Sequence, residues 1–194
     1  MGGVAVRGRD QPLSFECRGA NAKASAEPAS HPMQITIVVK LLTLLTVANG
    51  VPVIAKLIMG ERWSWPLDGG CRFLDGRPLL GESKTVRGLV LSIVTTGVAA
   101  LLLGLDVSTG FLVGAAAMAG DLFSSFVKRR LGLRSSSRAT GLDQIPESLL
   151  PTLLCWYELD LTAADVAAVA GIFLVGEIVL SRLLFWLKIR DRPY

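Results

Sequence analysis

The sequence predicts an all-α membrane protein with five transmembrane helices and two basic cytoplasmic loops. Hydrophobic residues make up 51% of the chain and charged residues 19%, and the mean hydropathy is +0.51. Long apolar segments alternate with short polar ones, and Lys and Arg gather in every second polar segment. Such a composition and charge pattern are typical of proteins whose polar residues are confined to loops between membrane-spanning helices.

Five apolar segments supply the expected helices, at residues 35–59, 88–105, 110–127, 145–157 and 166–187. The first exceeds the roughly 20 residues needed to cross a bilayer, and Pro52 within it predicts a kink. In that segment Lys56 is expected to extend toward the membrane surface. Asn49 either belongs only to the kinked helix or lines a polar cavity. Residues 106–109 are expected to form a turn.

The loop charges predict the topology. The loops at 60–87 and 128–142 and the C-terminal end are rich in Lys and Arg, whereas 106–109 and 158–165 contain neither. Because Lys and Arg favour the cytoplasmic side, five crossings place both basic loops and the C-terminus there. The alternation supports the short fourth segment as a true crossing and predicts a multi-pass protein of the cytoplasmic membrane.

The first 32 residues are expected to be a disordered extension, because they are rich in Gly, Ala, Ser, Arg and Pro and lack an apolar period. Met33, immediately before the first apolar segment, is an alternative start. Residues 33–194 then form a single catalytic domain.

Several functional classes are disfavoured. The three cysteines, Cys17, Cys71 and Cys155, are widely spaced and indicate neither a disulfide framework nor a zinc site. His31 is the only histidine, so a mechanism with a histidine base is not expected. The net charge of +4 is divided among loops between apolar segments rather than gathered on one basic face, so no nucleic-acid partner is expected.

The loop before the second helix contains a candidate phosphate site. Its spacing differs from a Walker A motif, because two extra residues separate Gly81 from Lys84. Ser83 or Thr85 is expected to cap the second helix, which puts Lys84 and Arg87 in or beside its first turn. There the two cations either bind an anion together with the free backbone N–H groups or only set topology and contact lipid headgroups. In the same loop, Asp68 is either a turn residue or a residue facing a metal or ribose.

A second candidate site runs from Gly120 to Gln144. Asp121, Ser124, Ser125 and Lys128 share one helical face, and Asp143 stands where the next helix begins. A carboxylate inside a membrane helix usually serves a site or pairs with a cation. Mg²⁺ commonly binds one or two carboxylates, with substrate phosphates and water completing its shell. The alternative is that Asp121 merely pairs with Lys128 or with a group on a neighbouring helix.

Together these motifs resemble those of the CDP-archaeol synthase family, integral-membrane cytidylyltransferases distantly related to CDP-diacylglycerol synthases. The resemblance covers nearly everything from Met33 onward and rests on an ordered set: Asn49-Gly50-Val51-Pro52, Pro66-Leu67-Asp68-Gly69-Gly70, Asp75-Gly76-Arg77, Gly81-Glu82-Ser83-Lys84-Thr85-Val86-Arg87-Gly88, Gly120-Asp121-Leu122, Ser125-Phe126-Val127-Lys128-Arg129-Arg130-Leu131-Gly132 and Asp143-Gln144. This chain departs from the family at Ile145-Pro146-Glu147-Ser148 and in its run Ser135-Ser136-Ser137-Arg138.

The resemblance implies five transmembrane helices and a cytoplasmic, Mg²⁺-dependent site that transfers CMP from CTP to a lipid phosphate in the bilayer, releasing pyrophosphate. It implies that Asp121 and Asp143 form the metal–triphosphate site and, with Lys128, the catalytic group. The implied nucleotide and phosphate contacts are Asn49, Asp68, Lys84, Thr85, Arg87, Ser124, Ser125, Arg129, Arg130 and Gln144.

The expected acceptor is an archaeol-type ether lipid phosphate, such as 2,3-bis-O-geranylgeranylglycerol phosphate. The alternatives are the same chemistry on phosphatidic acid, or a small transporter or structural membrane protein without enzymatic activity. The oligomeric state stays open.

Overall fold

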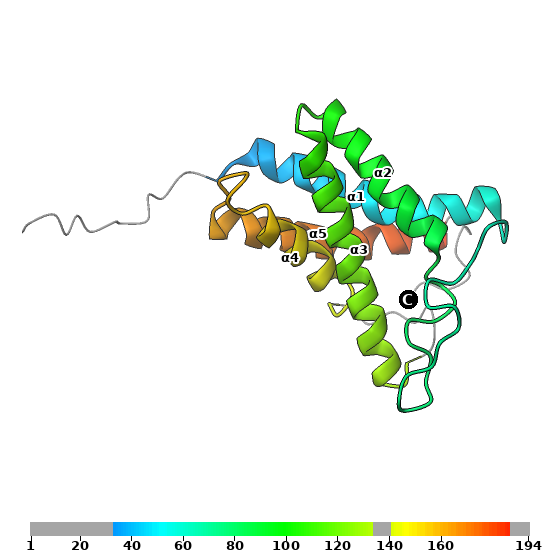
Figure 1. Cartoon of the computed structure of the whole chain (residues 1–194). Helices are drawn as coiled ribbons and strands as arrows, with labels where there is room; N and C mark the ends of the chain where they lie inside the picture. Colours follow the sequence, from blue (N-terminus) through cyan, green and yellow to red (C-terminus); the bar gives the residue numbers. More distant parts are fainter. Residues whose placement is uncertain (1–32, 134–140, 187–194) are drawn as a thin grey trace, which may run out of the picture. The chain divides into compact units, whose positions relative to one another are not determined.

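The computed structural model describes residues 33–133 and 141–186, apart from the side chains of 183–185. The described residues form five helices and no strands: α1 (Ile35–Met59), α2 (Val86–Leu102), α3 (Val107–Arg130), α4 (Gln144–Leu154) and α5 (Ala163–Trp186). Figure 1 shows them in order from blue to red. The all-α prediction is confirmed. The predicted disorder of 1–32, the Ser135–Arg138 run and the basic end at 188–192 lie outside the described residues.

Helix boundaries follow the sequence closely, with one correction. The α1 bounds are those expected, and α2 begins directly after Thr85, whose side chain accepts a hydrogen bond from the backbone N–H of Gly88. The predicted turn at 106–109 is wrong, because Val107 already opens α3 and Asp106 is its N-cap residue. The chain reverses direction one turn earlier, at Gly104, which has a φ of +67°.

Helix length and composition make this a multi-pass membrane protein. Among the residues that the structure describes, three helices are long and apolar enough to cross a membrane, namely α1, α3 and residues 163–182 of α5, and α2 is a shorter apolar helix. With 11 residues, α4 is the shortest of the five described helices. At about 1.5 Å per residue it spans roughly half of a bilayer core.

Helix α3 packs against α1, α2 and α4, and it runs through the middle of the helices in Figure 1. Small residues permit this close packing: a Cβ at Gly110 would lie 2.5 Å from the side chain of Ala100, and one at Gly114 would lie 3.1 Å from the backbone of Ile93. Leu41, Leu44 and Leu45 of α1 and Val113 and Ala117 of α3 belong to the same buried core. Such packing by small residues is typical of membrane helices, where no water drives apolar association.

Candidate active site

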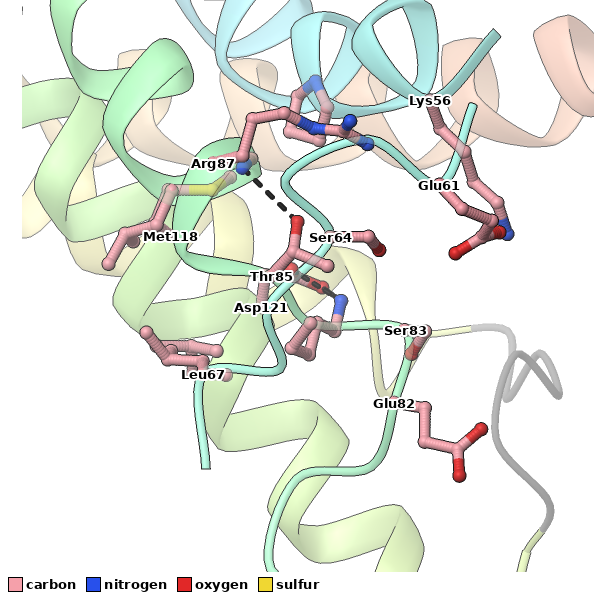
Figure 2. Close-up of a pocket in the computed structure, with 15 residues that line it drawn as sticks. Lys56, Glu61, Ser64, Leu67, Glu82, Ser83, Thr85, Arg87, Met118 and Asp121 are labelled. Carbon is pink, nitrogen blue, oxygen red and sulfur yellow. Dashed lines mark hydrogen bonds and ion pairs between the residues drawn. The ribbon is translucent and has the colours of Figure 1, made fainter. Parts of the chain in front are cut away.

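A cavity of about 300 Å³ opens where α1 ends, α2 begins and α3 passes. Figure 2 shows its lining side chains, with Asp121 of α3 labelled among them. The lining residues are Pro52, Lys56, Glu61, Ser64, Leu67, Glu82, Ser83, Lys84, Thr85, Arg87, Gly88, Leu89, Met118, Asp121 and Leu122. The cavity therefore combines charged groups from the loop and from three helices with apolar side chains of the same helices.

Lys84 and Asp121 form an ion pair within this cavity. The Lys84 ammonium donates to both carboxylate oxygens of Asp121 at 2.5 Å, and the two side chains are 21% and 22% exposed. This finding differs from the alternative in which Asp121 pairs with Lys128. The partner is Lys84, 37 residues earlier in the sequence.

The N-terminal end of α2 lies at the cavity. Thr85 caps the helix at 3.2 Å from the Gly88 nitrogen, and Thr85, Arg87 and Gly88 all line the cavity. A Cβ at Gly88 would lie 3.3 Å from the Cβ of Pro52, so glycine lets α1 and α2 approach closely here. Backbone N–H groups at a helix start favour a phosphate, and the positive end of the helix dipole adds to this preference.

Arg87 is fixed by backbone carbonyls at the end of α1. Its guanidinium donates to the Gly60 carbonyl at 3.2 Å and to the Arg62 carbonyl. These bonds hold the arginine at the cavity wall and tie the start of the loop to α2.

Asp68 organises the loop that forms one cavity wall. Its carboxylate accepts hydrogen bonds at 3.0 Å from the backbone N–H groups of Gly70, Leu80 and Gly81. Burial alone would raise the pKa of Asp68, but these three hydrogen bonds to the charged form outweigh it and hold the pKa below its ordinary value. The geometry is that of a turn residue, and its predicted contact with substrate stays a prediction.

The middle of the same loop is held against the C-terminal end of α3. Arg77 donates to the Arg130 carbonyl at 2.7 Å and to the Arg129 carbonyl at 3.3 Å, which satisfies two of the terminal carbonyls of the helix. Arg130 pairs with Asp75, donates to the Pro78 carbonyl at 2.6 Å, and stacks over the rings of Phe73 and Phe126. The loop is thereby held against α3.

Asp75 takes part in these contacts between the loop and α3 through its ion pair with Arg130. Desolvation alone would raise the pKa of the Asp75 carboxyl, but the backbone N–H of Arg77 and the positive charge of Arg130 together outweigh it and hold the pKa below the ordinary value. Asp75 is a turn residue, because its carboxylate accepts a hydrogen bond from the backbone N–H two residues later.

The predicted face of α3 is largely buried. Ser124, Ser125, Lys128 and Arg129 are all buried, and Ser124 donates to the Asp121 carbonyl at 2.9 Å. Arg129 donates to the Leu133 carbonyl at 2.7 Å and so helps to close the end of the helix.

A second ion pair links α3 with the start of α4. Lys128 and Asp143 lie 2.8 Å apart, with 9% and 14% of their side chains exposed. Next to Asp143, the Gln144 side chain accepts from the Gly141 N–H at 2.7 Å. Neither Lys128 nor Asp143 lines the cavity that holds Asp121. The structure gives the two aspartates separate lysine partners, and their joint binding of one metal stays a prediction.

Glu147 is a buried carboxyl group that the sequence reasoning did not single out as a site residue. It is 6% exposed and hydrogen-bonds the Asp121 side chain, with Glu177 of α5 also nearby. A Cβ at Gly120 would lie 2.4 Å from the Pro146 carbonyl oxygen and 2.7 Å from the Glu147 nitrogen, so only glycine permits this approach of α4 to α3. The signal in the sequence was a glycine directly before the membrane aspartate.

Of the residues predicted to bind substrate, Lys84, Thr85, Arg87 and Asp121 line the cavity. Asn49 does not; its amide donates to the Leu45 carbonyl of its own helix at 3.1 Å. The cavity also contains Lys56 and Glu61, which the sequence reasoning did not assign to substrate.

The donor set fits a metal carried by a nucleotide. Asp121 contributes a carboxylate to a cavity that also holds cations and a helix N-terminus. Among the described residues no group of three or more His, Cys, Asp or Glu side chains forms a metal cage. Mg²⁺ is usually bound by one or two carboxylates together with substrate phosphates, so the Asp121 carboxylate beside the free N–H groups at the start of α2 suits it.

Comparison with known proteins gives consistent matches. The sequence model of the CarS-like CDP-archaeol synthase family matches residues 33–194. The CDP-archaeol synthase of Pyrobaculum aerophilum is 30% identical over 167 residues, covering 84% of this chain and all of that protein. The CDP-archaeol synthase of Hyperthermus butylicus is 42% identical over 104 residues, covering 50% of this chain and 59% of that protein.

A solved structure, described as that of an intramembrane enzyme for archaeal membrane lipids biosynthesis, is also similar. It superposes with a TM-score of 0.56 at 28% identity, covering 71% of this chain and 90% of that one.

Proposed function

The chain belongs to the CDP-archaeol synthase family, and on that premise we propose that it transfers CMP from Mg²⁺-bound CTP to an archaeol-type ether lipid phosphate. Membership makes the protein a CTP-dependent cytidylyltransferase of lipid biosynthesis. The observation that supports the location of the reaction is the cavity in which the Lys84–Asp121 pair faces the N-terminal end of α2.

The charge balance of the cavity supports a requirement for Mg²⁺. Its lining carries three cations, Lys56, Lys84 and Arg87, and three carboxylates, Glu61, Glu82 and Asp121. A triphosphate carries several negative charges, which this neutral lining does not compensate. A divalent cation bound to the phosphates removes much of that excess and polarises the phosphoryl oxygens.

In the proposed complex the triphosphate lies against the start of α2. The free N–H groups of the first turn and the Arg87 guanidinium bind its oxygens. Lys84 turns from Asp121 to the phosphates, and Asp121 would hold the metal. Asp143 and Lys128 are assigned to the same metal–triphosphate site on the family resemblance, and Arg129 and Arg130 to its positive surroundings.

The reaction is an in-line displacement at the α-phosphorus. An oxygen of the lipid phosphate forms a new bond to the α-phosphorus of CTP, the bond to the bridging β-phosphate oxygen breaks, and pyrophosphate leaves. A phosphate monoester has a second pKa of about 6, so the nucleophile is largely dianionic at neutral pH. A protein base is then unnecessary, and catalysis consists of positioning and charge neutralisation.

We place the cavity at the cytoplasmic surface of the cytoplasmic membrane, because the loop that forms its wall is rich in Lys and Arg and such loops lie on the cytoplasmic side of membrane proteins. Soluble CTP and a membrane-anchored lipid phosphate can meet there.

Product identification tests the proposal. Purified protein is incubated with CTP, Mg²⁺ and an equimolar mixture of geranylgeranyl ether lipid phosphate and phosphatidic acid, and lipids are analysed by mass spectrometry. We expect the CDP-linked ether lipid and pyrophosphate, with no product when Mg²⁺ is chelated. Transfer to phosphatidic acid alone would contradict the assigned acceptor, and absence of any CDP-lipid would contradict the function.

A further inference from the structure

The cavity has a lipid-facing side as well as a polar one. Pro52, Leu89, Met118 and Leu122 contribute apolar lining from α1, α2 and α3. The α1 turns that border it expose apolar side chains, including Ile54, Leu57 and Ile58. A lipid substrate needs such a border, because its phosphate must enter the cavity while its chains stay among apolar groups.

Lys56 stands on this border. It belongs to the last turn of α1 and lines the cavity. Its side chain is exposed, as is that of the next residue, Leu57, whereas Ala55 before it is buried. In Figure 2 it extends from α1 on the same side of the cavity as Glu61.

The three cations that line the cavity differ in the ion pairs and hydrogen bonds that they form. Lys84 is paired with Asp121, and Arg87 donates to the carbonyls of Gly60 and Arg62. Within the described part of the chain, the Lys56 ammonium makes no ion pair or hydrogen bond. Lys56 is therefore the cation that can receive an anion without first breaking an interaction seen in the structure.

We propose that Lys56 forms the subsite for the phosphate of the membrane-anchored acceptor, at the point where the lipid-facing surface of α1 meets the cavity. The subsite rests on the proposed function and deepens it by dividing the cavity. The triphosphate occupies the end near Lys84 and Asp121, and the lipid phosphate occupies the end near Lys56. An ammonium–phosphate hydrogen bond there also places the attacking oxygen toward the α-phosphorus.

Two other assignments of Lys56 give different results. A lysine that only extends to the membrane surface would affect insertion but neither substrate. A lysine that binds the triphosphate or the pyrophosphate product would affect CTP. Because the same phosphate chemistry arises from lipid and nucleotide, the test must vary the two substrates separately.

The experiment measures initial rates for Lys56→Gln while lipid phosphate and CTP are varied in turn. Lys40→Gln is the matched control, since Lys40 is a lysine of the same helix that does not line the cavity. Loss of one charge-assisted hydrogen bond at an exposed site predicts an increase of about tenfold in KM for the lipid phosphate. KM for CTP is expected to stay within about twofold, and Lys56→Arg is expected to restore most of the lipid KM.

A binding measurement supplies a readout independent of turnover. An ether lipid phosphate and its dephosphorylated alcohol are titrated separately into the protein in detergent micelles, without CTP. Wild type should prefer the phosphate, and Lys56→Gln should lose that preference.

An unchanged lipid KM in Lys56→Gln, or a rise in KM for CTP alone, would overturn the proposal. Failure of the proposed function would look different, because wild type would then form no CDP-lipid at all.

Discussion

Replacement of Asp121 by asparagine tests the cavity most sharply, because it removes one charge and almost no volume. The carboxylate lies 2.5 Å from the Lys84 ammonium, where two unit charges attract by about 6–7 kcal/mol at an effective dielectric constant of about 20. Both side chains are about one-fifth exposed, and desolvation and screening offset most of that attraction. We therefore expect the free energy of unfolding to fall by about 2 kcal/mol.

The effect on catalysis should be larger. Loss of one preorganised charged group at a reacting centre typically lowers turnover by about 10²–10³-fold. The assay follows transfer of α-labelled CMP from CTP to lipid, at saturating Mg²⁺, for wild type and Asp121→Asn. The matched control is Asp106→Asn, since Asp106 lies at the other end of α3 with an exposed side chain that makes no capping hydrogen bond. The control should keep near-normal turnover.

The double variant Lys84→Met/Asp121→Asn separates catalysis from folding. It removes both charges of the ion pair, so no unpaired charge remains in the cavity. The free energy of unfolding should therefore recover relative to Asp121→Asn alone, whereas turnover should not recover. Recovery of turnover together with stability would refute the assigned role and leave Asp121 as a structural partner of Lys84.

Three further outcomes are expected. Gly120→Ala should lower the melting temperature, because its Cβ would lie 2.4 Å from the Pro146 carbonyl oxygen. Gly176→Ala is the control, since its Cβ would have no atom within 4 Å and should leave the melting temperature unchanged. Equal melting temperatures for the two variants would contradict the close packing of α3 on α4. The folded-state pKa of Asp68 lies below its ordinary value of 3.8, so the stabilisation by its carboxylate is complete above pH 3.8 and is lost as the pH falls below that value. Below pH 3.8 the melting temperature of wild type should therefore fall more steeply than that of Asp68→Asn. Parallel curves of melting temperature against pH would refute this stabilising role of Asp68. Glu147→Ala should lower turnover about tenfold, because it removes the hydrogen bond to Asp121. Glu147→Gln can still donate a hydrogen bond and should keep most of the wild-type turnover. Equal turnover in the two variants would contradict a hydrogen-bonding role of Glu147.

The sequence predicted the helices well because their signals are local. Apolar length located α1, and the threonine before α2 is the residue that caps it. The error at 106–109 arose because Ser108 and Thr109 look like turn residues, yet membrane helices accommodate such side chains readily. Thr109 is buried and donates to Glu158.

The site was harder to predict because its contacts join distant segments. Helical spacing placed Asp121 near Lys128, whereas the fold of the loop brings Lys84 to Asp121 and leaves Lys128 to Asp143. No local pattern encodes that exchange of partners. Glu147 escaped notice for the same reason, since its contact with Asp121 depends on the approach of α4 at Gly120.

Equilibrium binding of CTP, measured with and without Mg²⁺ and in the absence of lipid, shows whether the cavity at the start of α2 is the nucleotide site. We expect wild type to bind CTP only when Mg²⁺ is present. Lys84→Met should weaken this binding by about tenfold or more, and Lys40→Met should leave it unchanged. Undiminished, Mg²⁺-dependent binding by Lys84→Met would show that the nucleotide site is not the cavity at the start of α2.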